Sequence, residues 1–204
     1  MKKRILGIIA IIAAIAFVGF ACGGGGGGGT TYNIGDTGPG GGIVFYYNAT
    51  GFTVYQDKDD TVGITCNYLE VAPEDLGPVT WASFASSVTG LAEDTIGSGK
   101  ANTDIIITAY PKPVDNASNN AAWACVDYRG PENKDDWFFP NLGELEQVYL
   151  NLVKDKTGHG FLSGYWASYC DADPEDAKGL FFNTGFTFGG GKDYSYTVRP
   201  IRAF

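Results

Sequence analysis

The stretch from Asp135 to Leu145 reads Asp-Asp-Trp-Phe-Phe-Pro-Asn-Leu-Gly-Glu-Leu, and it decides how the rest of the chain can fold. Pro140 excludes helix immediately before it, because proline restricts the preceding residue to extended conformations. Asn141 is a favourable N-cap, and Glu144 can return a hydrogen bond to the backbone N–H of that cap. The stretch therefore predicts a buried aromatic strand or turn that runs directly into a capped helix.

The residues after Asn141 continue this helix. Apolar side chains recur at helical spacing and form one face: Leu142, Leu145, Val148, Tyr149 and Leu152. Lys154 and Lys156 favour the C-terminal end of a helix dipole, and Gly158 can terminate it. We expect the three aromatic residues before the helix, Trp137, Phe138 and Phe139, to belong to the core and not to a ligand platform.

The N-terminus has the pattern of an export signal. Lys2, Lys3 and Arg4 precede an uncharged apolar run over residues 5–20, and Ala21-Cys22 follows. We interpret residues 1–21 as a lipoprotein signal peptide, with another export signal as the alternative; an apolar run of this length is short for a bilayer span. Residues 22–31 would then be a lipidated Cys22 with a flexible poly-glycine tether, and residues 32–204 a single domain.

The charge balance limits the class of partner. Cleavage before Cys22 removes three of the 14 basic residues and none of the 23 acidic ones, which changes the net charge from −9 to −12. A nucleic-acid-binding protein is expected to carry a basic patch, so this acidity argues against nucleic acid as a partner. It suits an extracytoplasmic domain attached to the membrane through Cys22.

The cysteines and the single histidine argue against a zinc site. After cleavage Cys66, Cys125 and Cys170 remain in the domain, without a C-x-x-C spacing, and His159 is the one histidine. An odd number of cysteines allows at most one intramolecular disulfide. Cys125 falls on the apolar face of a predicted helix, which favours an inert buried thiol over a nucleophile.

The remaining elements are predicted from periodicity and turn residues. Strands are expected at 43–47, 52–56, 68–72, 161–169, 180–188 and 195–204, and helices at about 103–109 and at 121–128. The first two strands should form a hairpin around residues 48–51, and the last two should be separated by Gly189–Gly191. Glu70 lies inside an apolar strand, where it either faces solvent by alternation or is a buried, paired carboxylate. Arg199 or Arg202 could supply its partner.

Five blocks of the chain resemble the domain named for the C-terminal region of the Legionella collagen-like adhesin. They begin at Gly35, Tyr68, Asp136, Gly164 and Val198 and read GDTGPGGGIVF, YLEVAP, DWFFPNLGEL, GYWAS and VRPIR. The resemblance covers roughly residues 32–204. It implies an α+β, C-type-lectin-like fold related to the formylglycine-generating enzyme scaffold, with mixed antiparallel sheets, paired terminal strands, two flanking helices and long loops.

The resemblance also bears on the cysteines. Many relatives have a cysteine between the final two arginines, where this chain has Pro200. The disulfide that this cysteine would form with a helix cysteine such as Cys125 is therefore absent. Cys66 and Cys170 lie beside two of the matching blocks, and we expect a Cys66–Cys170 disulfide with Cys125 free.

The function expected from these features is that of a non-catalytic, exported surface module. Acyl transfer needs a nucleophile with a base in reach, and neither His159 nor Ser163 lies in such a motif. Glycan or glycosaminoglycan binding or adhesion is suggested for the adhesin; the alternative is a structural lipoprotein that meets an envelope or host protein, and a hydrolase is a weaker third. The predicted location is the bacterial outer membrane or cell surface.

The candidate ligand residues lie in the block that begins at Gly164 and directly after it. They are Tyr165, Trp166, Tyr169, Asp171 and Asp173. Calcium prefers clustered carboxylate oxygens, so Asp171, Asp173, Glu175 and Asp176 are the candidate metal ligands, although a solvated acidic loop explains them more simply.

Overall fold

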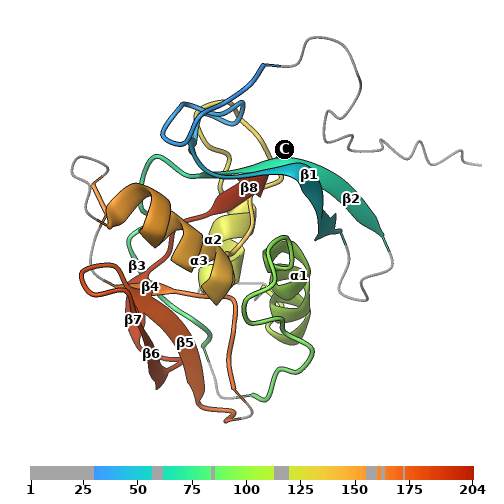
Figure 1. Ribbon diagram of the computed structural model, residues 1–204. Coiled ribbons are helices and arrows are strands. Elements are labelled where there is room, and N and C mark those ends of the chain that lie inside the picture. Colours follow the sequence, from blue (N-terminus) through green and yellow to red (C-terminus); the bar gives the residue numbers. More distant parts are fainter. Residues whose placement is uncertain are drawn as a thin grey trace, which may run out of the picture.

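The computed structural model describes residues 30–56, 62–83, 86–112, 120–154, 160–161, 164–171 and 173–204. The fold is α+β, as expected: two β-sheets are accompanied by three helices (Figure 1). The resemblance implied two flanking helices, whereas the structure has a third among the described residues: α1 (Gly99–Ala109) is the helix expected at about 103–109, and it begins four residues earlier. None of the helices among the described residues has the length and hydropathy needed to cross a membrane.

The first sheet has the order β1-β2-β8. β1 (Ile43–Tyr55) pairs antiparallel with β2 (Gly63–Val71) over most of its length. The predicted hairpin around residues 48–51 is wrong, because the chain continues through this segment as one strand. Its register shifts between Tyr47 and Phe52, and Gly51 adopts a φ of 78°, so the turn-like sequence forms an irregularity within the strand.

The C-terminus is paired in this first sheet, as its apolar sequence predicts. β8 (Ile201–Ala203) is antiparallel to β2, with Arg202 opposite Glu70. The terminal strands β1 and β8 share a sheet but do not pair with each other, since β2 lies between them. The first described residues also reach this end of the molecule: the ring of Tyr32 lies 5.3 Å from that of Phe204.

The second sheet has the order β3-β7-β4-β5-β6. Its strands are β3 (Pro78–Thr80), β7 (Ser195–Thr197), β4 (Gly164–Trp166), β5 (Asp176–Phe181) and β6 (Phe186–Gly191). The predicted strand at 180–188 is wrong, because the chain turns at residues 182–185 and returns as β6. Gly189–Gly191 therefore belong to a strand and not to a loop.

The helices lie between the two sheets in Figure 1. α3 (Leu142–Val148) begins at the predicted N-cap, Asn141, and α2 (Ala121–Asp127) begins at the residue expected, with Asn120 as its cap. The Asn141–Glu144 capping box is present with both of its hydrogen bonds. α3 continues as a π-helical turn, η1 (Tyr149–Val153), and Gly158 lies outside the described residues.

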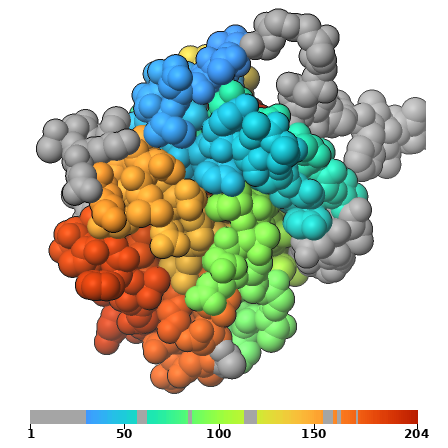
Figure 2. All heavy atoms as spheres, in the orientation of Figure 1, coloured from blue at the N-terminus to red at the C-terminus, as the bar shows by residue number. Residues whose placement is uncertain are grey.

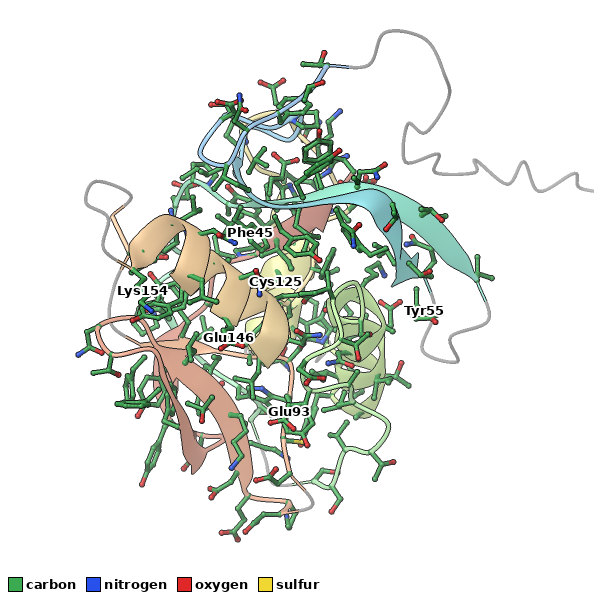
Figure 3. The ribbon with its side chains drawn as sticks, viewed as in Figure 1. Phe45, Tyr55, Glu93, Cys125, Glu146 and Lys154 are labelled. Carbon is green, nitrogen blue, oxygen red and sulfur yellow. The ribbon has the colours of Figure 1, made fainter. Side chains whose placement is uncertain are left out.

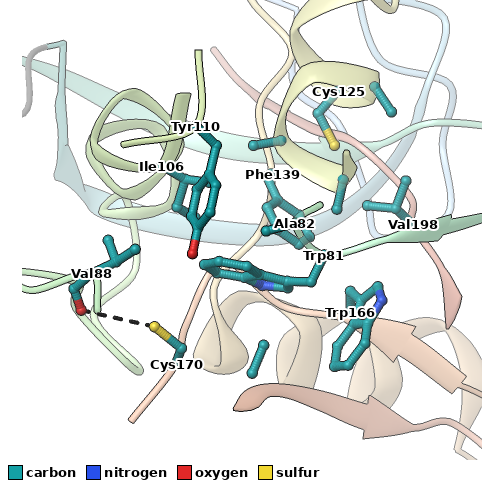
Figure 4. Close-up of a cluster of buried hydrophobic side chains, with 14 residues drawn as sticks. Trp81, Ala82, Val88, Ile106, Tyr110, Cys125, Phe139, Trp166, Cys170 and Val198 are labelled. Carbon is teal, nitrogen blue, oxygen red and sulfur yellow. Dashed lines mark hydrogen bonds between the residues drawn. The ribbon is translucent and has the colours of Figure 1, made fainter. Parts of the chain in front are cut away.

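Two clusters of buried side chains form the core. The first joins α1 and α2 to the second sheet around Trp81, Phe139 and Trp166 (Figure 4). The second packs α3 between the sheets, and it includes Phe45, Phe138 and Tyr165. Trp137, Phe138 and Phe139 are all buried, which confirms their predicted core role. Figure 2 shows the segments that surround these clusters packed closely against one another.

The predicted disulfide is wrong. Cys170 is a free buried thiol, so it does not form the expected bridge with Cys66. Cys170 lies in the first cluster, where its Sγ is 3.8 Å from the carbonyl oxygen of Val88. Cys125 is free and buried, as expected, and burial raises its pKa well above the ordinary value for a thiol.

Candidate functional site

The aromatic residues predicted to bind a ligand are mostly inside the protein. Tyr165 and Trp166 in β4 are both 0% exposed. The hydroxyl of Tyr165 donates to Asp75, and Tyr169 packs partly buried against the second cluster. The prediction placed these rings on a surface because their strand is rich in aromatics. β4 lies inside the second sheet and is covered on both faces, so the rings of Tyr165 and Trp166 are core residues.

The predicted calcium ligands do not assemble into a site. Asp171 forms an ion pair with Lys178 at 2.6 Å, and Asp173 accepts a hydrogen bond from the backbone N–H of Glu175. Among the described residues no group of three or more His, Cys, Asp or Glu side chains could hold a metal ion. Asp176 begins β5, so the acidic run is divided between a loop and a strand.

The sequence left Glu70 as either a solvent-facing residue or a buried, paired carboxylate. In the structure it is fully buried and paired. Its Oε1 accepts from Arg202 at 2.8 Å and from the backbone N–H of Gly40 at 2.9 Å, and its Oε2 accepts from the backbone N–H of Gly42 at 2.9 Å. A Cβ at Gly40 would lie 2.6 Å from Oε1, so the glycines allow the loop to approach the carboxylate. Burial raises the pKa of Glu70, although Arg202 opposes the shift. The arrangement fixes the N-terminal loop on the first sheet.

Arg199 has a similar structural role just beyond the C-terminal end of β2. Its Nε and Nη2 donate to the carbonyl oxygens of Ala72 and Pro73, at 2.7 and 2.5 Å. Its Nη1 lies 3.4 Å from Asp75, and its guanidinium stacks 4.0 Å from the ring centre of Phe161. Both arginines are therefore occupied in holding backbone segments together, which explains the VRPIR block without a ligand.

A surface pocket lies where β5 begins and β6 ends. It has a volume of about 510 Å³, within the range of small-molecule sites. We call it the β5–β6 pocket; its lining residues are Ser83, Glu175, Asp176, Gly191, Lys192, Asp193 and Tyr194. The ring of Tyr194 is 60% exposed. The pocket thus combines an accessible aromatic ring with three carboxylates and a hydroxyl.

Lys192 lines the β5–β6 pocket and is only 2% exposed. Its Nζ donates to the carbonyl oxygens of Ser86 and Pro174, at 2.8 and 2.9 Å, and lies 5.1 Å from the ring centre of Trp81. Burial lowers the pKa of Lys192. Because its ammonium group is directed at backbone carbonyls, Lys192 joins the loops around the pocket. Within the part of the chain that the structure describes, it forms no ion pair with the three carboxylates.

Further aromatic rings adjoin the β5–β6 pocket on one face of the second sheet. The rings of Phe181, Phe188 and Tyr196 lie together, with Phe188 4.5 Å from Tyr196. A Cβ added at Gly190 would meet Trp166, Tyr196 and Tyr194 within 4 Å, so this glycine lies between the aromatic group and the pocket. Phe186, in the same strand, is 73% exposed.

Sequence reasoning missed this site. Glu175 and Asp176 were candidates, but as calcium ligands, and Lys192, Asp193 and Tyr194 were not considered. The available signal was a short polar turn, Lys-Asp-Tyr, after three glycines. It was not recognised because Gly189–Gly191 were assigned to a loop, which concealed that the turn follows the end of β6, beside the acidic residues at the start of β5.

A second, smaller pocket of about 290 Å³ lies between α3 and the hairpin β5–β6. Its lining includes Glu93, Asp94 and Glu146, together with Gly185 and Thr187. Figure 3 labels Glu93 and Glu146, which lie below and on α3. The lining of this pocket has no basic residue. Together the two pockets place carboxylates near the start of β6 as well as near its end.

The chain was also compared with known proteins. It matches none of the protein-family models, and no curated protein matches it.

Proposed function

We propose that the chain is a non-catalytic exported lipoprotein with a C-type-lectin-like domain, and that this domain binds a carbohydrate in the β5–β6 pocket. The observation that carries the proposal is the exposed ring of Tyr194 beside the carboxylates of Glu175, Asp176 and Asp193. Carboxylates accept hydrogen bonds from sugar hydroxyls, and an aromatic face packs against the apolar face of a sugar ring.

The charge of the pocket narrows the class of carbohydrate. Three carboxylates line it, and the single basic residue in the lining, Lys192, is buried and bonded to backbone carbonyls. A sulfated glycosaminoglycan would bring further negative charge to this surface, which is unfavourable. The pocket therefore fits a neutral or amine-bearing sugar better than the glycosaminoglycan that the resemblance suggests.

The test is a thermal-shift screen of the full-length chain against neutral sugars, amino sugars and heparin. A ligand that binds only the folded state raises the unfolding midpoint. We expect a rise with a neutral or amino sugar, at least a tenfold loss of affinity in Tyr194→Ala, and an unchanged affinity in the matched control Phe186→Ala. A response to heparin alone, or none to any sugar, would contradict the proposal.

The anchor is tested separately. Cys22 lies outside the described residues, so its modification is proposed from the sequence alone. Expression in a bacterium with labelled palmitate should label the wild-type chain and not Cys22→Ala. Equal labelling of the two, or labelling of neither, would remove the lipid anchor from the proposal.

A further inference from the structure

β6 forms one edge of the second sheet. Among the described residues it pairs only with β5, whereas the opposite edge strand, β3, makes a bridge from Thr80 to Asn120. An edge strand presents a row of unpaired backbone groups to which another strand can pair. The open side of β6 can therefore accept a strand from a partner, independently of the β5–β6 pocket.

The register shows which backbone groups point outward. The N–H of Lys192 donates to the carbonyl of Glu175 at 2.7 Å, so these residues form a hydrogen-bonded pair across the hairpin. Bonded and non-bonded pairs alternate in an antiparallel ladder, so Gly191, Gly189 and Thr187 direct their N–H and C=O groups away from β5. Lys178, opposite Gly189, confirms this alternation, since its N–H donates to Tyr169 on the far side.

The edge carries none of the features by which proteins protect such strands. β6 reads Phe-Thr-Phe-Gly-Gly-Gly, without a lysine, a proline or any charged residue. A Cβ at Gly189 would meet only the side chain of Lys178, at 3.4 Å or more, so little covers the strand there. With Phe186 73% exposed, the edge is open along both its backbone and one face.

Carboxylates lie near both ends of this edge. Asp193 and Glu175 adjoin the end at Gly191, and Glu93, Asp94 and Glu146 share a pocket with Thr187. The nearby lysines do not balance them: Lys178 is paired with Asp171, and Lys192 is buried. A second copy of this chain would bring its own net charge of −9 to the surface, which disfavours self-pairing.

We propose that β6 binds an extended segment of a partner protein with basic side chains near both of its ends, which adds a strand to the second sheet. Thr187 and Gly189 would pair with its backbone, the aromatic face would contact alternate side chains, and the carboxylates would hold its cationic ends. Strand addition of this kind draws affinity from main-chain hydrogen bonds and specificity from side-chain pockets.

The test uses the full-length chain and a fluorescein-labelled peptide, Lys-Thr-Val-Thr-Val-Thr-Lys with blocked ends. We expect saturable binding in fluorescence anisotropy, at least a tenfold loss in Gly189→Pro, and unchanged affinity in Gly189→Ala. Proline removes the outward N–H of Gly189 without breaking the ladder to β5, and alanine keeps that N–H. Replacing both peptide lysines by glutamate should abolish binding.

A second probe covers the case in which Gly189→Pro fails to fold. The same peptide with N-methylated valines cannot form the strand ladder, so it should not bind the wild-type chain. Equal binding of the methylated peptide, or of Gly189→Pro with native circular dichroism, would overturn the proposal. So would a wild-type dimer in sedimentation that Gly189→Pro dissociates, without peptide binding.

These outcomes are separable from those of the carbohydrate proposal. Tyr194→Ala should lose sugar binding and retain the peptide, because its side chain does not contribute to the outward ladder. Gly189→Pro should show the reverse. Loss of both ligands in both variants would mean that the two sites are one, and it would overturn the strand-addition proposal.

Discussion

At the scale of single residues, the Glu70–Arg202 pair shows how a polar network can occupy a core. Arg202 donates from Nη1 to Glu70 and from Nε to Asp136, so one guanidinium joins β2, β8 and the loop before α3. Two backbone N–H groups complete the hydrogen bonds to Glu70. Such a pair contributes more to defining the structure than to net stability, but removing one member leaves a buried charge.

Arg202→Met should destabilise the protein by about 3–5 kcal/mol, because it leaves Glu70 buried with only backbone donors. The measurement is urea unfolding at neutral pH. Lys134→Met is the control, since Lys134 makes no ion pair among the described residues, and it should change stability by less than about 0.5 kcal/mol. An unchanged midpoint in Arg202→Met would show that the pair has no role in holding the first sheet.

The sequence could predict this pairing only as one of two alternatives. Alternation along a strand does not reveal which face is covered, and Glu70 is buried because the Gly38–Gly42 loop folds over it. Gly40 and Gly42 permit the close approach of this loop, because a Cβ at either position would lie 3.0 Å or less from a carboxylate oxygen of Glu70. What they approach is a side chain 28 or more residues away, and no local pattern encodes that contact.

At the scale of elements, the start of α3 combines a helix cap with a titratable group. Glu144 is fully buried and accepts from the backbone N–H groups of Asn141 and Gly97, at 2.8 and 2.9 Å. Burial raises the pKa of Glu144 to about 7, although these hydrogen bonds act in the opposite direction. The hydrogen bonds of Glu144 therefore connect the start of α3 to the segment that precedes α1.

This shift makes stability depend on pH in a defined direction. Between pH 4.5 and about 7 the folded protein retains a proton on Glu144 that the unfolded chain has lost. The free energy of unfolding should therefore fall as the pH rises through this range, by up to about 3 kcal/mol, and level off above it. Glu70 and Asp75, whose pKa values burial also raises, act in the same direction.

Glu144→Gln is the variant that isolates this effect. Its amide nitrogen would face a backbone donor, so stability at pH 5 should fall by about 1–3 kcal/mol. The decline of the unfolding free energy between pH 5 and 8 should also become shallower than in the wild type. Urea titrations at pH 5, 6, 7 and 8 measure both effects, and an identical slope in the two proteins would exclude Glu144 as the titrating group.

Helices were predicted more successfully than strands for a physical reason. The cap at Asn141 and the apolar periodicity after it are local, and α3 begins where they place it. The hairpin β5–β6 depends on pairing between strands, and its glycine-rich half carries no alternation to detect. The β5–β6 pocket lies at that hairpin. Because the hairpin was predicted as one strand over residues 180–188, the pocket could not be recognised from the sequence.

At the scale of the whole molecule, the two sheets should unfold as one unit. Both core clusters contain residues from helices and from the second sheet, and β7 and β8 are separated only by residues 198–200. A Cβ at Gly179 would lie 2.3 Å from the carbonyl oxygen of Tyr165, so Gly179→Ala should strain the second sheet. It should destabilise the protein by about 1–3 kcal/mol.

In Gly179→Ala, the unfolding midpoint should be the same whether it is measured by tryptophan fluorescence or by far-ultraviolet circular dichroism, because cooperative unfolding gives coincident transitions. Gly189→Ala, where the added Cβ meets only the end of a lysine side chain, should leave the midpoint within error of the wild type. Two separate transitions in Gly179→Ala would show that the sheets are independent.

The positions of the chain ends have a mechanical consequence. The first described residues and the C-terminus lie together at the first sheet, whereas β5 and β6 lie at the opposite end of the molecule (Figure 1). A pulling force between the N-terminal segment and a molecule held at β6 must traverse both sheets. Two segments connect the sheets directly, residues 72–77 between β2 and β3 and residues 198–200 between β7 and β8, and Arg199 joins them through its hydrogen bonds to Ala72 and Pro73. Resistance to shear would then depend on that buried joint, far from either surface at which the load is applied.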